Sequence, residues 1–110
     1  GNEYISIVPN GDIYPCHQFV GKEEYILGNI NNEKIEIPEA ITNMFREAHV
    51  YNKETCQTCW NKFYCSGGCH ANAINFNNDI KKPYDLGCEM QKKRTECAIM
   101  IQAKLLTEGE

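Results

Sequence analysis

Four cysteines fall within fourteen residues of this chain, as Cys56, Cys59, Cys65 and Cys69, in the pattern Cys-x2-Cys-x5-Cys-x3-Cys. Two intervening residues let a pair of thiolates meet one metal, because they turn the chain and backbone N–H groups point at the sulfurs. Intervals this short and regular suit long-range disulfides poorly. We therefore expect reduced, metal-bound thiolates, which organise the fold more than hydrophobic periodicity does.

The number of cysteines bears on which metal is bound. The chain has seven, the other three being Cys16, Cys88 and Cys97. Thiolates bind both zinc and iron-sulfur clusters, but structural zinc typically uses two Cys-x2-Cys pairs, or one pair with His, and this chain has one such pair. Six or seven thiolates exceed the need of one zinc ion. Two polynuclear clusters are the favoured interpretation, and a zinc-stabilised interaction module is the alternative.

Composition excludes several classes of function. The 110 residues are 42% hydrophobic and 24% charged, which is typical of a single globular domain over 1–110. The net charge is -4 and basic residues are interspersed with acids, so nucleic acid is not an expected partner. No apolar run approaches the roughly 20 residues that span a bilayer, and residues 1–4 are neither a signal peptide nor a natural start. We interpret the chain as a cytoplasmic fragment of a larger protein.

A small α+β fold, stabilised by metal, is expected to carry these cysteines. Residues 4–16 predict a β-hairpin with an Asn-Gly turn, which places Cys16 at the end of its second strand. Residues 25–30 predict a further short extended segment, in which Gly28 marks a bend or a close approach. The cysteine loop, residues 56–69, follows.

Three helices are expected, over residues 38–50, 69–76 and about 85–106. Pro38 suits a first helical turn because that turn needs no N–H, and Asp85 is the expected cap of the last helix. Ile41, Phe45 and Ala48 share a face of the first helix. The last helix carries an apolar stripe made of Leu86, Met90, Cys97, Ile101 and Leu105.

The cysteine spacing resembles that of the SPASM domain, the C-terminal auxiliary-cluster module of radical S-adenosylmethionine (SAM) peptide maturases. That pattern is a Cys, a Gly, a Cys five positions after the Gly, the Cys-x2-Cys-x5-Cys-x3-Cys array and a last Cys. The matching positions here are Cys16, Gly28, Cys56, Cys59, Cys65, Cys69 and Cys88. Residues 56–73 are most similar to maturases of Cys-rich SCIFF precursor peptides, which form thioether cross-links.

The resemblance implies two [4Fe-4S] clusters. Cys56, Cys59, Cys65 and Cys88 would hold one, called here the four-cysteine cluster. Cys69 would join Cys16 at the other, called here the Cys16–Cys69 cluster. Because this ligation ties distant segments together, the metal-free chain is expected to be largely unstructured. Preparation in air could load zinc into the same thiolates.

The resemblance also implies partners outside this chain. An upstream barrel domain would bind and cleave SAM, and a Cys-rich precursor peptide would be the substrate. The SAM-cleaving signature Cys-x3-Cys-x2-Cys is absent, because Cys65-x3-Cys69 is followed by Asn72 where the third cysteine is required. The chain alone is therefore expected not to be catalytic.

One position departs from the family pattern. The family's second Cys would fall five residues after Gly28, where this chain has Glu33. Two interpretations stay open. Glu33 is a carboxylate ligand, or it is a surface acid beside an iron with an open coordination position, to which a substrate Cys thiolate would bind.

Cys97 has two interpretations as well. On a continuous helix, nine residues rotate by about 180° and rise by about 13.5 Å, so Cys88 and Cys97 point in opposite directions and cannot share a cluster. Cys97 is then either a further ligand of the Cys16–Cys69 cluster, which we favour narrowly, or a small apolar residue on the helical stripe. Trp60, Phe63 and Tyr64 either shield a cluster from water or pack in the core.

Overall fold

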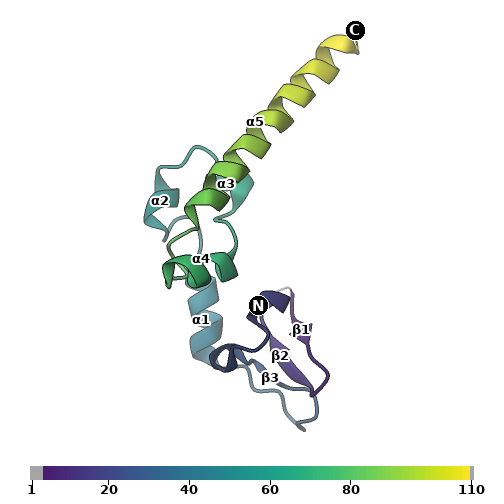
Figure 1. Ribbon diagram of the computed structural model, residues 1–110, viewed down its shortest axis with the longest axis vertical. Helices are drawn as coiled ribbons and strands as arrows, with labels where there is room; N and C mark the ends of the chain where they lie inside the picture. Colours follow the sequence, from purple (N-terminus) through teal and green to yellow (C-terminus); the bar gives the residue numbers. More distant parts are fainter. Residues whose placement is uncertain (1–3, 110) are drawn as a thin grey trace. The chain divides into compact units, whose positions relative to one another are not determined.

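The computed structural model describes residues 4–109. Its chain divides into two compact units, Gly1–Glu47 and Ala48–Glu110, and each is considered by itself. The elements confirm a small α+β fold, with antiparallel strands near the N-terminus, short helices and a long C-terminal helix (Figure 1). The expectation of one domain over the whole chain stays a prediction.

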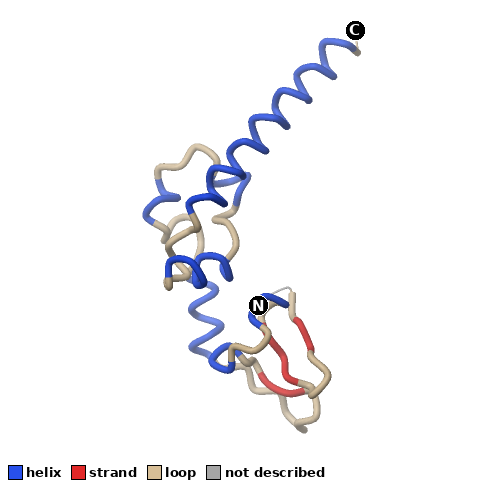
Figure 2. The backbone as a smooth tube through the Cα atoms, in the orientation of Figure 1, coloured by secondary structure: helices blue, strands red, loops and turns tan. Residues whose placement is uncertain are grey.

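The N-terminal unit is built on a three-stranded antiparallel sheet, in the order β1-β2-β3 (Figure 2). Its strands are β1 (Ser6–Ile7), β2 (Asp12–Tyr14) and β3 (Gly28–Asn29). Ser6 pairs with Tyr14 in the first ladder, and Ile13 pairs with Gly28 in the second. The predicted hairpin and the short third strand are both confirmed.

The hairpin turn depends on Gly11. Its N–H donates to the Val8 carbonyl at 2.8 Å, and its φ of 94° lies in the left-handed region that favours glycine. The Asn10 side chain accepts a hydrogen bond from the backbone N–H of Asp12 at 2.9 Å. Asn29 then donates to the Asp12 carboxylate at 3.0 Å, which ties the third strand to the turn.

Phe19 is the centre of the small core in this unit, and its side chain is 1% exposed. It belongs to the short 3-10 helix His17–Phe19, which follows Cys16 directly. Its ring lies 4.7 Å from that of Tyr25 and 5.6 Å from that of Phe45, which comes from α1 (Glu39–Glu47). Aromatic contacts thus hold the segment after Cys16 against the loop and the helix.

The described part of the C-terminal unit contains four helices, namely α2 (Glu54–Gln57), α3 (Lys62–Cys65), α4 (His70–Asn77) and α5 (Asp85–Glu108). The short helix α4 and the long helix α5 confirm two predicted helices. Helix α3 packs against α5, and the Phe76 ring stacks on Tyr84 with centroids 4.1 Å apart. The buried apolar side chains are few and mostly small, including Ala71, Ala73 and Ile80.

The end of α1 and the cap of α5 differ from the prediction. Helix α1 ends at Glu47, before the expected residue 50, because the next residues form a turn in which the Asn52 N–H donates to the His49 carbonyl at 2.9 Å. Asp85 is not the cap of α5. Tyr84 precedes the helix and its carbonyl accepts the Cys88 N–H at 3.0 Å, so Asp85 lies in the first turn, where a carboxylate suits the helix dipole.

The apolar stripe of α5 is exposed. Leu86 is 55% exposed and Leu105 is 61% exposed, and every described residue after Thr95 is exposed. Trp60, Phe63 and Tyr64 are also more than half exposed, so the interpretation that they pack in the core is wrong. Both features place large apolar side chains on the surface of the C-terminal unit.

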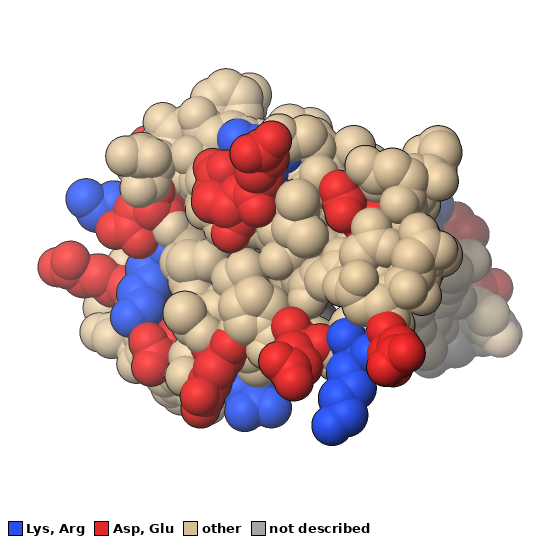
Figure 3. All heavy atoms as spheres, turned by 90° about the horizontal axis from the view of Figure 1, so that it is seen from below, with Lys and Arg blue, Asp and Glu red and all other residues tan. Residues whose placement is uncertain are grey.

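No described helix is long and apolar enough to cross a membrane. On the face shown in Figure 3, basic side chains lie among more widely spread acidic ones. The surface charge there is mixed, in keeping with the interspersed charges of the sequence.

Two glycines allow a controlled test of the hairpin turn. A Cβ at Gly11 would lie 2.7 Å from the Asn29 Oδ1, whereas a Cβ at Gly21, with a similar φ of 91°, meets nothing within 4 Å. Both alanine variants carry the same backbone strain, so Gly11→Ala should lose about 1–3 kcal/mol more, from overpacking. We expect its melting temperature to fall at least about 4 °C below that of Gly21→Ala in thermal unfolding followed by circular dichroism. Equal melting temperatures would contradict the contact.

Candidate metal centre

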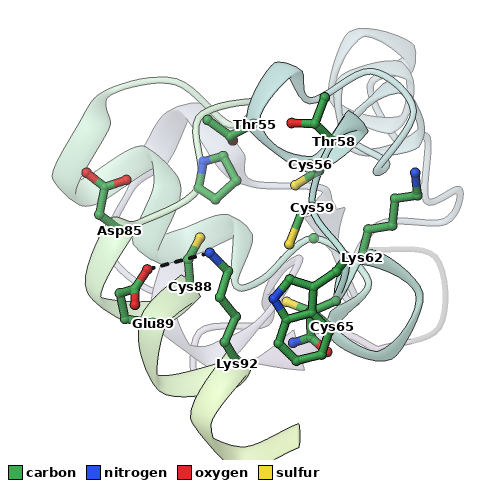
Figure 4. A pocket seen from close by; sticks show the side chains of 14 residues that line it. Thr55, Cys56, Thr58, Cys59, Lys62, Cys65, Asp85, Cys88, Glu89 and Lys92 are labelled. Atoms are coloured by element: carbon green, nitrogen blue, oxygen red, sulfur yellow. Dashed lines mark ion pairs between the residues drawn. The ribbon is translucent and has the colours of Figure 1, made fainter. Parts of the chain in front are cut away.

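Four of the predicted ligands surround one cavity in the C-terminal unit. The cavity has a volume of about 450 Å³, and its walls include Cys56, Cys59, Cys65 and Cys88. Figure 4 shows the Cys88 sulfur facing the sulfurs of the other three across this space. Residues up to 32 positions apart in the sequence therefore direct thiols into one place, as the four-cysteine cluster requires.

Short turns and helix ends position these thiols. Cys56 lies in α2, and its carbonyl accepts the Cys59 N–H at 3.1 Å, so the Cys-x2-Cys segment forms one tight turn. Cys65 ends α3 and donates its N–H to the Asn61 carbonyl at 2.9 Å. Cys88 comes from the first turn of α5. The backbone that carries each thiol is thus fixed by local hydrogen bonds.

A run of left-handed residues separates Cys65 from Cys69. Ser66, Gly67 and Gly68 have φ values of 61°, 98° and 79°. The two glycines adopt such positive φ values without steric cost. The chain therefore reverses directly after Cys65. Cys69 is exposed and precedes α4, and it borders a second cavity of about 420 Å³ together with Cys65 and Cys88. Cys69 is the one member of the array that does not border the four-cysteine cavity.

The other candidate residues lie elsewhere. Cys16 is in the N-terminal unit, so its joint ligation with Cys69 stays a prediction. Glu33 is exposed in the loop after β3. Cys97 is exposed on α5 and borders neither cavity described above. All seven cysteines are free thiols in this structure.

Without metal, burial raises the pKa of the Cys56 thiol and of the Cys88 thiol, and neighbouring thiols act in the same direction. Both are therefore protonated thiols near neutral pH. Metal binding must displace these protons, because the thiolate is the ligand.

Comparison with known families identifies the family of this chain. The family model for the SPASM iron-sulfur cluster-binding domain matches residues 1–60, more than half of the chain. The chain belongs to the SPASM family. The matched part contains Cys16, Gly28, Cys56 and Cys59. SPASM domains belong to radical SAM enzymes. The search of curated proteins found no match.

The four-cysteine cavity also contains a buried amide that could donate a hydrogen bond to an iron-sulfur cluster. Asn61 also borders it, is 1% exposed, and has no hydrogen-bond partner for either side-chain polar atom within the described residues. Leaving a buried amide unpaired costs about 1–3 kcal/mol. The sulfurs of a cluster accept hydrogen bonds from such groups, so the residues present fit an iron-sulfur cluster.

The spread of the thiols also bears on the metal. Tetrahedral zinc with Zn–S bonds of about 2.3 Å needs sulfurs about 3.8 Å apart. Among residues 4–109, no three Cys, His, Asp or Glu side chains form a group that could hold a single metal ion. In a polynuclear cluster each thiolate binds a different iron, so the ligands stand around a larger body. A single zinc ion and a cluster thus differ in how far apart their thiolate ligands stand.

Lys53 and Asn61 were not predicted as part of the site. Both are buried, Lys53 at 0% and Asn61 at 1% exposure, although their residue types usually lie on the surface. Their only sequence signal is position, since Lys53 comes three residues before Cys56 and Asn61 lies between Cys59 and Cys65.

Removing one thiol from the cavity should remove one cluster. For Cys88→Ala we expect about four fewer irons per chain than in the parent protein after anaerobic reconstitution, because the fourth ligand is lost. Leu86→Ala is the matched control, since Leu86 lies on the same helix turn without bordering the cavity. Iron and sulfide are counted chemically, and an unchanged count in Cys88→Ala would contradict its role. The same iron and sulfide count on Cys97→Ala decides between the two interpretations of Cys97. A lower count means that Cys97 is a ligand, and an unchanged count means that it is an apolar residue of the stripe.

Proposed function

We propose that this SPASM domain holds two [4Fe-4S] clusters and serves a radical SAM maturase that installs thioether cross-links in a Cys-rich ribosomal peptide. Its part in that enzyme is substrate positioning and electron transfer. The observation that carries the proposal is the single cavity bordered by Cys56, Cys59, Cys65 and Cys88, together with the unpaired buried amide of Asn61.

The four-cysteine cluster suits electron transfer. Four cysteine ligands satisfy a [4Fe-4S] cluster completely, which leaves no coordination position for substrate. The cavity also reaches the surface of the unit, since Trp60 and Glu89 border it and both are exposed. A fully ligated cluster close to the surface is within reach of a redox partner.

The Cys16–Cys69 cluster suits substrate positioning. The family's remaining cysteine is replaced by Glu33, so Cys16 and Cys69 are joined at most by Cys97. An iron with an open position would accept the thiolate of a substrate Cys and present it for sulfur-carbon bond formation. This assignment depends on Glu33 being a surface acid, which its exposure in the loop supports.

The partners follow from what the chain lacks. It has no Cys-x3-Cys-x2-Cys signature, so SAM cleavage belongs to an upstream barrel domain. The likeness of residues 56–73 to maturases of SCIFF peptides supports a Cys-rich precursor as the substrate. The isolated domain would then position peptide and pass electrons but would not generate a radical.

Anaerobic reconstitution with iron and sulfide tests the cofactor. We expect about eight irons per chain and a Mössbauer spectrum of [4Fe-4S] clusters, because two such clusters carry four irons each. One tightly bound zinc per chain that iron cannot replace would instead support the zinc-stabilised interaction module and would reject the proposal.

The open iron is tested at Glu33. We expect Glu33→Ala to keep the parental iron count and Mössbauer spectrum, because a surface acid contributes no bond to iron. Glu36→Ala, at another exposed acid of the same loop, is the matched control. A new iron environment in Glu33→Ala alone would show that the carboxylate is a ligand and that the position is not open.

A further inference from the structure

Lys53 is a fully buried cation in the C-terminal unit. Its side chain is 0% exposed, and its Nζ donates a hydrogen bond to the Gly67 carbonyl at 2.8 Å. A lysine ammonium has three N–H donors, and within the described residues this is the hydrogen bond that Nζ makes. Burying a charge is costly unless an opposite charge accompanies it. The position therefore calls for an anion nearby.

The Lys53 side chain is held in place from both ends. Its backbone carbonyl accepts the Cys56 N–H at 2.9 Å, so the residue begins the turn that carries Cys56. At the other end, a Cβ on Gly67 would lie 2.8 Å from Nζ, so only glycine leaves room for the ammonium. Gly67 itself borders the four-cysteine cavity. The charge thus lies next to the cavity wall and is enclosed by the unit.

The groups near Lys53 that become negative on metal binding are cysteine thiols, because Gly67, which Nζ contacts, borders the same cavity as Cys56 and Cys65. Burial lowers the pKa of the Lys53 ammonium, and Cys56, Cys65, Cys88 and Cys69 act in the opposite direction. The surroundings contain no described carboxylate hydrogen-bonded to Nζ. Three of these four residues, Cys56, Cys65 and Cys88, border the four-cysteine cavity. A cluster held in that cavity is the anion that this buried cation can pair with.

We infer that Lys53 is a built-in counter-ion of the four-cysteine cluster, which makes the cluster easier to reduce than it would be with a neutral residue at this position. The inference rests on the proposed cluster in that cavity. Reduction by an external one-electron donor adds one negative charge to a group that is already anionic. A fixed positive charge in a low-dielectric surrounding stabilises the more negative state more strongly.

The test is the midpoint potential of the reconstituted full chain, titrated with dithionite and followed by electron paramagnetic resonance. The four-cysteine cluster is identified as the signal that Cys59→Ala abolishes. For Lys53→Met we expect parental iron content and a reduction equilibrium constant at least tenfold lower, which is about 59 mV for one electron. An unchanged potential would overturn the inference.

Lys82→Met is the matched control. It removes the same formal charge from an exposed side chain of the C-terminal unit that borders neither cavity. Water screens such a charge, so the potential should stay close to the parental value. An equal decrease in both variants would mean that net charge, rather than the buried position, sets the potential.

Lys53→Arg covers the case in which Lys53→Met does not take up iron. Iron binding in the arginine variant together with its loss in the methionine variant supports the counter-ion, because the charge is kept while the shape changes. Loss of iron in both variants would show that the size of the side chain matters rather than its charge. That result would reject the role of Lys53 as a counter-ion. The iron and sulfide count of the parent protein is measured first, so a failure of the proposed function is recognised separately.

Discussion

The proposed bonds between cysteine thiolates and an iron-sulfur cluster are the interaction on which the C-terminal unit would depend. Its buried apolar side chains are few and mostly small, such as Ala71 and Ala73, and a core of this size contributes little burial energy. The centre of the unit is instead a cavity bordered by four cysteines. A cluster bound there would join α2, α3 and α5, and folding would then be coupled to cofactor binding. The N-terminal unit differs, because Phe19 and its aromatic partners give it an ordinary core.

Features with local causes could be predicted from the sequence. The Asn-Gly pair specifies the hairpin turn, and the glycine at position 28 forms the expected close approach, with a Cβ there only 3.0 Å from the Ile35 side chain. The spacing of Cys56, Cys59 and Cys65 is also local, and its convergence with Cys88 could be predicted only from the resemblance to SPASM domains. The family match bears out that resemblance.

Features with tertiary causes could not be predicted in the same way. A lysine and an asparagine beside a cysteine motif normally lie in water, and only the folded chain shows Lys53 and Asn61 enclosed. The first turn of α5 begins at Asp85 because the Tyr84 carbonyl accepts a helical hydrogen bond, a difference of one residue that propensity does not resolve. The stripe on α5 is periodic without being buried, because periodicity records which residues share a face and does not supply the surface that covers it.

Helix α5 is continuous in its hydrogen bonds, but its two halves should differ in stability. It runs for 24 residues, or about 36 Å, and Thr95 is its last buried residue. The turns before Thr95 share the stability of the cysteine cavity. Every described residue after it is exposed, and a free helix shorter than about 12–15 residues is marginal in water. In the isolated chain, amide hydrogens should therefore exchange slowly up to Thr95 and quickly beyond it, so the far half of the helix opens and closes independently of the cluster.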